Sequence, residues 1–204
     1  MPVPIPDDNG SITRLITEWT SDPTHSQFTD ENHVPYYGNI GDWDMSNVRN
    51  LDNLFKNYTN FNDDISDWNT SNVTSMSHTF EGCSDFNQPI GSWDTASVTN
   101  MEGLFMGAAS FNKPLGSWNV SNVTSMESLF EGAESYNQRM TFWRTESVVN
   151  MLQMFCGATK FNQNLNNWRT ENVTSMVRMF KNAKSFNRNI RGWKMDGIFG
   201  PPKR

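Results

Sequence analysis

Apolar and polar positions recur along this chain at a fixed interval of 25 residues. Tryptophan marks the interval, and when each tryptophan is counted as position 1, valine falls at position 6, methionine mostly at position 9, phenylalanine at position 13 and asparagine at position 20. Because so short a unit cannot bury its own apolar side, we expect stacked units to share one continuous core. The tryptophans of this series are Trp43, Trp68, Trp93, Trp118, Trp143, Trp168 and Trp193.

This pattern predicts an α/β solenoid with short parallel strands and one short helical turn in each 25-residue repeat. Positions 9, 12, 13 and 16 have the i, i+3, i+4, i+7 spacing of a helical turn, and the glycine common at position 15 suits its end. Positions 5–8 and 19–23 resemble short extended pieces that pair from coil to coil. Pro89 and Pro114 lack a backbone N–H, so they favour a thin or interrupted ladder at positions 19–23.

The asparagine at position 20 is present in all six repeats, for example as Asn87 and Asn112. It fits a stacked ladder that satisfies backbone groups at a bend, and ligand binding is the alternative.

The N-terminal end of such a stack needs a cover. The stretch NGSITRLITEWTSD predicts a helix with Ser11 as its N-cap. Ile12, Leu15, Ile16 and Trp19 share one face of that helix, which can cover the first coil. The predicted organisation is a tail at 1–10, a capping helix and lead-in at 11–42, six repeats at 43–192, and a partial repeat with a C-terminal tail at 193–204.

The two cysteines are expected to be free thiols. Cys83 and Cys156 fall at positions 16 and 14, three coils apart. At about 5 Å per coil their Cα atoms would be about 15 Å apart, beyond the reach of a disulfide. We expect Cys83 to be buried and Cys156 to lie near the surface.

Targeting signals are weak in this sequence. No apolar run is long enough for a membrane span, and the start MPVPIPDDNGS lacks the basic and apolar regions of a signal peptide. The compartment is unknown from the sequence, and a location inside a cell or within a virion or other assembly is favoured over secretion.

The repeat motif W-D/N-x-S-N-V-T-x-M-x-x-L/M-F-x-G-A-x-x-F-N resembles the BspA-like leucine-rich-repeat surface-protein family, in the 25-residue version first catalogued in mycoplasma proteins. The resemblance covers residues 43–192. It implies a leucine-rich-repeat-like right-handed coil and, in bacterial members, surface adhesion. It carries no catalytic residue to this chain.

Charge separates the two halves of the chain. Residues 1–102 carry a net charge of −13 and residues 103–204 a net charge of +7. Since a solenoid converts sequence order into distance along an axis, we expect a rod that is acidic at one end and basic at the other. Drift of solvated positions is the alternative explanation. The candidate acidic end consists of Asp42, Asp44, Asp63, Asp64, Asp67 and Asp94.

Apolar residues replace polar ones at a few positions in the basic half. Leu152 and Val177 occupy position 10, Cys156 occupies position 14, and Phe142 occupies position 25. An exposed apolar patch marks a partner contact, and a buried variant of the repeat is the alternative. Together with the basic column, the candidate partner-binding residues are Arg139, Phe142, Arg144, Leu152, Cys156, Arg169, Val177, Arg188, Arg191 and Lys194.

No catalytic, metal or cofactor site is predicted. His25, His33 and His78 share no ligand spacing, and phosphate-binding, nucleophile and zinc motifs are missing from the sequence. A calcium ion at Asp63, Asp64 and Asp67 is a weaker alternative to a solvated acidic loop.

We therefore expect a non-enzymatic protein–protein interaction or assembly module. Its partner would be a protein, including other copies of the chain bound head to tail. Nucleic acid is disfavoured because the aromatic residues are expected to be buried. The alternatives are a structural subunit of a larger array, such as a virion or surface layer, and an adhesin for host surface proteins.

Overall fold

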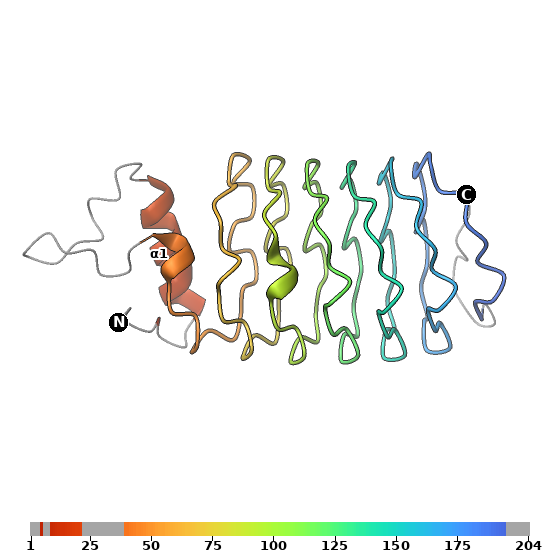
Figure 1. Ribbon diagram of the computed structural model, residues 1–204, viewed down its shortest axis with the longest axis horizontal. Coiled ribbons are helices and arrows are strands. Elements are labelled where there is room, and N and C mark those ends of the chain that lie inside the picture. The colour runs from red at the N-terminus through yellow and green to blue at the C-terminus, as the bar shows by residue number, and fades with distance from the viewer. Residues whose placement is uncertain (1–4, 6–8, 22–38, 195–204) are drawn as a thin grey trace, which may run out of the picture.

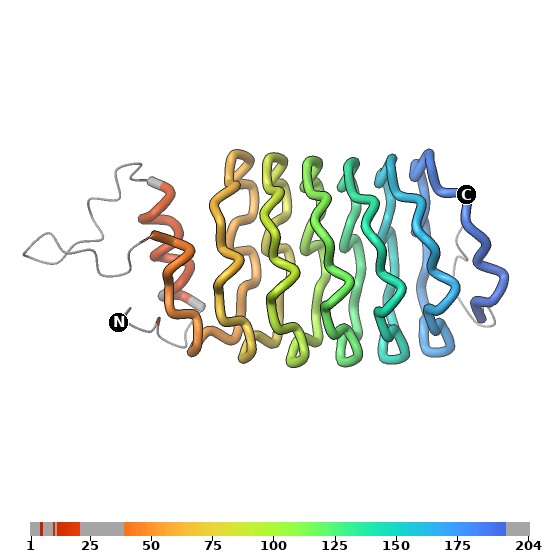
Figure 2. The backbone as a smooth tube through the Cα atoms, viewed as in Figure 1, coloured from red at the N-terminus to blue at the C-terminus, as the bar shows by residue number. Residues whose placement is uncertain are grey.

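Residues 39–194 form a row of stacked coils, and helix α1 (Asn9–Ser21) lies at the N-terminal end of the row (Figure 1 and Figure 2). The structure is a computed structural model that describes residues 5, 9–21 and 39–194. Its other helical elements in these ranges are the 3-10 helices η2 (Ile40–Asp42) and η3 (Ile90–Ser92). Isolated parallel bridges join residues 25 apart in the sequence: Asn50, Ser75, Asn100, Ser125, Asn150 and Ser175.

Backbone hydrogen bonds between coils follow an alternating rule. The amides at positions 9, 11, 13 and 15 donate to the carbonyls at positions 8, 10, 12 and 14 of the next coil. Gly103 N thus donates to Glu127 O at 2.8 Å, and Phe105 N donates to Leu129 O at 3.0 Å. These four amides point the same way along the row, so the segment at positions 9–15 presents donors to the next coil. The amide at position 7 donates the other way, as Thr99 N does to Thr74 O at 2.9 Å.

The segment at positions 9–16 forms consecutive turns, so the expected helical turn is not found there in the described coils. The reason is the sign of φ at positions 11 and 15, which is positive in every repeat from Asn53 to Asn182, as at His78 (56°) and Gly82 (73°). An α-helix requires negative φ throughout. The amides that would bond within a helix donate to the neighbouring coil instead.

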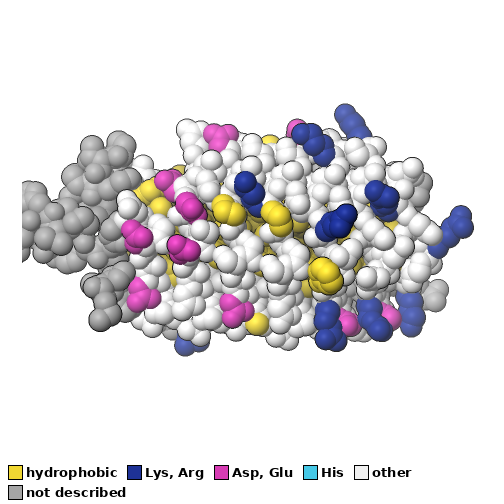
Figure 3. Space-filling model, viewed as in Figure 1, with side chains coloured by type: hydrophobic (Ala, Val, Ile, Leu, Met, Phe, Trp, Pro, Cys, Tyr) yellow, Lys and Arg dark blue, Asp and Glu magenta, His cyan; other side chains and the backbone are white. Residues whose placement is uncertain are grey.

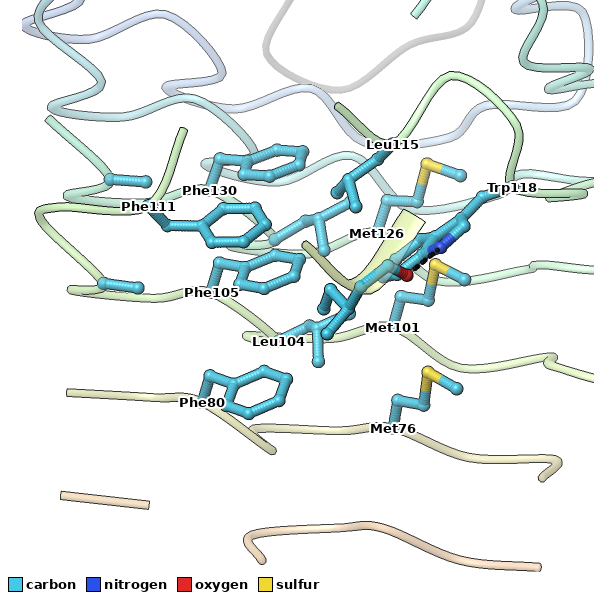
Figure 4. Close-up of a cluster of buried hydrophobic side chains, with 14 of the residues drawn as sticks. Met76, Phe80, Met101, Leu104, Phe105, Phe111, Leu115, Trp118, Met126 and Phe130 are labelled. Atoms are coloured by element: carbon cyan, nitrogen blue, oxygen red, sulfur yellow. Dashed lines mark hydrogen bonds between the residues drawn. The ribbon is translucent and has the colours of Figure 1, made fainter. Parts of the chain in front are cut away.

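The apolar columns are buried, as predicted. Rings at positions 13 and 19 stack within each coil, with 4.1 Å between the centroids of Phe105 and Phe111. They also stack between coils, with 5.5 Å between Phe105 and Phe130 (Figure 4). Each tryptophan from Trp68 onward donates its indole N–H to the backbone carbonyl 28 residues before it in the chain. The core is therefore one continuous column in which the indole nitrogen is satisfied.

The asparagine ladder at position 20 is confirmed. Asn112 N donates to Asn87 Oδ1 at 3.0 Å, and the same bond recurs between the other coils. The glutamine common at position 21 adds a second link, since Gln138 Nε2 donates to Asn112 O at 3.1 Å. Side chains thus join the coils in the segment where prolines interrupt the sequence, and positions 19–23 form no strand in the described coils.

Helix α1 begins at Asn9, so Ser11 lies inside the helix and the prediction of Ser11 as N-cap was wrong. A polar residue after Asn9 and Gly10 mimics a cap in sequence, but the helical backbone starts two residues earlier. Ile12, Leu15 and Ile16 are buried. Trp19 meets Phe61 edge to face, with centroids 6.2 Å apart. The apolar face of α1 therefore packs on the core of the first coil.

Both cysteines are free, Cys83 buried and Cys156 half-buried, as predicted. The predicted tails and most of the lead-in, at residues 1–4, 6–8, 22–38 and 195–204, lie outside the described residues, as do His25 and His33.

Candidate functional site

The structure separates the ten predicted partner-binding residues into three surfaces. Positions 21–25 carry Arg139, Phe142, Arg188 and Arg191, position 2 carries the basic column, and positions 10 and 14 carry the apolar patch. Only the first surface brings an aromatic ring and guanidinium groups into one groove.

A shallow groove of about 920 Å³ is lined by residues of four successive repeats on the first surface. Arg139, Phe142 and Arg188 line it, so three of the predicted residues meet there. The sequence analysis did not predict the other lining residues, because they follow the repeat consensus. They all occupy positions 20–25, as Phe142 does, and this shared range was the signal that could have placed them beside it. They are Pro114, Gly116, Ser117, Asn137, Gln138, Thr141 and Gln163.

The side chain of Phe142 is 82% exposed. At the same position, Ser92 Oγ donates to Ser66 O at 2.8 Å and Ser117 Oγ donates to Gly91 O at 2.6 Å. Phenylalanine cannot form this coil-to-coil bond, so the substitution removes a stabilising link and places an apolar ring in solvent. Neither core packing nor coil pairing accounts for an aromatic residue at this position.

Two guanidinium groups flank the groove. Arg188 takes the place of the ladder glutamine, and its Nε donates to Asn162 O at 2.8 Å. That bond fixes the side chain on the coil and leaves the terminal nitrogens available for an external acceptor. Arg139 is exposed and forms no ion pair with the described residues.

The basic column at position 2 is largely engaged within the chain. Arg144 Nε lies 3.4 Å from Glu146 Oε1, and Arg169 contacts both Glu146 and Glu171 at 3.9 and 3.8 Å. The pKa of Glu146 is lowered first by its own backbone amide and then by Arg144 and Arg169. These exposed pairs contribute little to stability, but they reduce the positive potential of the column. Lys194 at its end is exposed.

The apolar patch is less open than its sequence indicates. Leu152, Cys156 and Val177 are half-buried. The pKa of the Cys156 thiol is raised, chiefly by burial and also by the nearby Glu131 carboxylate. Only part of each of these three side chains is therefore exposed. This burial fits the alternative interpretation, a buried variant of the repeat, better than an exposed apolar patch.

The acidic residues near α1 also fall into two groups. Asp42, Asp63, Asp64 and Asp67 line one depression with residues of η2. The pKa of Asp64 is lowered by hydrogen bonds from Ser66, the backbone amide first. Within the part of the chain that the structure describes, no group of three or more His, Cys, Asp or Glu could hold a metal ion.

Asp44 and Asp94 belong to the second group, at position 2. Each accepts a backbone N–H two residues on, from Ser46 and Ala96 respectively. A local turn therefore accounts for these two carboxylates.

One face of the molecule displays the charge gradient directly. Acidic side chains gather on the half nearer α1, and Lys and Arg side chains gather on the other half (Figure 3). Position 21 illustrates it with Asp63 in an early coil, Lys113 in the middle and Arg188 in a late one.

Comparison with known proteins gave one family. The model described as "Mycoplasma protein of unknown function, DUF285" matches residues 24–142 and residues 114–199. Neither the curated proteins nor the solved structures gave a match. Among the described residues, no helix combines the length and the apolar character needed to cross a bilayer.

Proposed function

The chain belongs to the DUF285 family, and from its surface we propose that it is a non-enzymatic protein–protein interaction or assembly module. Its binding surface would be the groove that holds Phe142, Arg139 and Arg188, which we name the Phe142 groove. The coils would serve as a rigid support that holds these side chains at fixed spacing.

The proposed fold type is an α/β solenoid of the leucine-rich-repeat-like, right-handed kind, and the proposed finer relationship is to the BspA-like proteins. Coil-to-coil bonds at 25-residue intervals and shared apolar columns support the first proposal. The motif of the repeats supports the second.

The exposed ring of Phe142 is the observation that carries the functional proposal. Aromatic and arginine residues dominate the energetics of protein interfaces, and here they line one groove. A matching partner segment would bury an apolar side chain against the ring and place carboxylates on Arg139 and Arg188. A single exposed ring is not the row of stacking platforms that single-stranded nucleic acids use, so a protein partner fits better.

Affinity capture with matched variants tests this proposal. Tagged wild type, Phe142→Ser, Arg139→Glu and Val149→Ser would be compared by quantitative mass spectrometry of the proteins that they retain. Val149 is the matched control because it is also an exposed apolar side chain, at 41%, and lies outside the groove. We expect a set of proteins retained by wild type and Val149→Ser and lost with both groove variants. Identical sets for all four proteins would refute the proposal.

The opposite charges of the two halves favour a second candidate, a structural subunit of a larger array. In that case basic coils of one copy would meet the acidic coils of another. Sedimentation velocity of the intact chain in low and high salt separates the two functions. Oligomers that dissociate with salt support the array, and a monomer in both buffers supports the interaction module.

A further inference from the structure

One side of the row is acidic at the end near α1 and basic at the far end. It consists of positions 20–25 of the six repeats, and we name it the groove face because it contains the Phe142 groove. Segment 62–67 carries three aspartates, segments 112–117 and 137–142 carry one basic residue each, and segment 187–192 carries two arginines. Segments 87–92 and 162–167 carry no charge. The aspartates and arginines of this face are exposed.

This order of charges decides how the face could pack on itself. The coils follow one another in a nearly straight row (Figure 2), so two copies can meet about a two-fold axis that runs along the row or across it. An axis along the row would set the three aspartates against the same three of the other copy, and like charges would meet at both ends. An axis across the row reverses the second copy, so that the acidic segment of each copy faces the basic segment of the other.

The reversed arrangement matches the two ends position by position. Each position then opposes the same position of a repeat at the other end of the row, and position 21 holds Asp63 in the first repeat and Arg188 in the last. The Nε of Arg188 is bonded to Asn162 O, and its terminal nitrogens can bind the opposing carboxylate by charge-assisted hydrogen bonds. At no position of the groove face do two like charges oppose each other in this arrangement.

The Phe142 groove lies at the centre of this arrangement. Eight of its ten lining residues come from segments 112–117 and 137–142, which flank the two-fold axis. The 82% exposed ring of Phe142 opposes position 25 of the other copy, next to Gly116, where the lack of a side chain leaves room for a ring. Lys113 opposes Gln138, whose Nε2 donates to Asn112 O at 3.1 Å and whose Oε1 can accept a hydrogen bond from the lysine.

We propose that the partner of the Phe142 groove is a second copy of this chain, packed antiparallel on the groove face to form a closed dimer. This inference rests on the proposed function, because it names the occupant of that groove. Two phenylalanine rings, one from each copy, anchor the centre, and an Asp63–Arg188 pair lies at each end. The contact occupies the same face in both copies, so association stops at two.

Sedimentation velocity over a concentration series tests the dimer. In low salt we expect the intact chain to pass from monomer to dimer as its concentration rises to about 0.1 mM and to form nothing larger. High salt should shift the equilibrium toward monomer. Phe142→Ser should raise the dissociation constant at least tenfold. Val149→Ser, the exposed apolar control outside the groove, should change it less than about twofold.

Exchange of charges tests the antiparallel arrangement. One variant carries Arg188→Glu and Arg191→Glu, and the other carries Asp63→Lys and Asp67→Lys. Each variant alone sets like charges against each other at both ends and should dimerise at least tenfold more weakly than wild type. An equimolar mixture restores opposite charges at both ends of a heterodimer, so its dissociation constant should return to within about threefold of the wild-type value. This recovery also shows that both variants are folded.

Lys181→Glu combined with Lys184→Glu is the control for net charge. It makes the same change in charge as the arginine variant, at exposed positions outside the groove face, and should alter dimerisation less than about threefold. Equal weakening by this control would overturn the proposal. So would a wild type that stays monomeric in low salt, oligomers that grow beyond two copies, a Phe142→Ser variant that dimerises like wild type, or a mixture that does not recover.

Failure of the dimer and failure of the proposed function are distinguishable. A monomeric wild type that still retains proteins through the Phe142 groove in the affinity capture would overturn the dimer and leave the proposed function standing. A monomeric wild type whose captured proteins do not depend on the groove would overturn both.

Discussion

The ring of Tyr136 lies on that of Phe130, with 4.0 Å between centroids and 11° between planes, and its hydroxyl is enclosed without a hydrogen-bond partner among the described residues. Burial raises the pKa of this phenol far above its ordinary value. The same position holds phenylalanine in the other repeats. The oxygen thus occupies a place where the neighbouring coils have only carbon and hydrogen.

Replacing Tyr136 with phenylalanine should raise the free energy of unfolding by about 1 kcal/mol, because a buried hydroxyl without a partner keeps its desolvation cost. Urea denaturation measures the change. The reciprocal change Phe161→Tyr, at the same position one coil later, should lower stability by a similar amount. A loss of stability in Tyr136→Phe would mean that the hydroxyl has an acceptor.

The asparagine ladder gives a second prediction. Asn112 Oδ1 accepts the backbone amide of Asn137 at 3.0 Å, so Asn112→Ala removes the acceptor of a half-buried donor. We expect a loss of about 1 kcal/mol in the free energy of unfolding. Asn112→Asp keeps an acceptor oxygen and should lose less. Equal losses in the two variants would show that the cost comes from something other than the acceptor.

The two cysteines should differ in reactivity toward a thiol reagent. Burial raises the pKa of Cys83 from 9.0 to about 12, and the thiolate is the reactive form. The half-buried Cys156 should therefore be labelled first, and Cys83 only when the protein unfolds. Mass spectrometry of Cys83→Ser and Cys156→Ser proteins assigns each rate.

The same pKa shift predicts a pH effect on stability. Because the folded pKa of Cys83 lies above the unfolded value, the neutral thiol stabilises the fold below about pH 9. That contribution should decline between about pH 9 and 12, where the unfolded chain releases the proton first. Cys83→Ser should show a flatter decline over this range in denaturation experiments, and parallel curves would contradict the assignment.

The position of α1 predicts how the chain could be made to self-associate. Leu15→Asp places a carboxylate on the buried face of the helix and should displace it from the first coil. The acidic end then becomes accessible to the basic coils of another copy, and we expect more self-association than in wild type at low salt, reversed at high salt. Arg14→Ala, on the exposed face, is the control. Sedimentation velocity provides the measurement, and a monomeric Leu15→Asp variant would contradict this role for α1.

Much of the core could be predicted because its signal is periodic. Each column from Trp43 to Trp193 repeats at one interval, and such columns are buried together. The turns at positions 9–16 could not be predicted, because apolar spacing says nothing about the sign of φ. His78, Ser128 and Gln153 adopt positive φ at position 11, and their residue types do not indicate this conformation.

The candidate site was predictable in part. Phe142 was identified because it breaks a polar column, and its exposure followed from that. The sequence did not show that Arg188 would meet it across two coils while Arg169 turns to Glu146. That distinction depends on which side of the coil each position faces, and charge counting does not contain this information.

The alternating bonds between coils also restrict how this chain can change in length. Gly103 meets Glu127 and Phe105 meets Leu129 because every offset is set by the same interval. Loss or gain of a single residue within a coil would shift each following donor away from its acceptor and each ring out of its column. Duplication or deletion of a whole 25-residue unit preserves all of these contacts, so descendants of this gene should differ from it by complete coils.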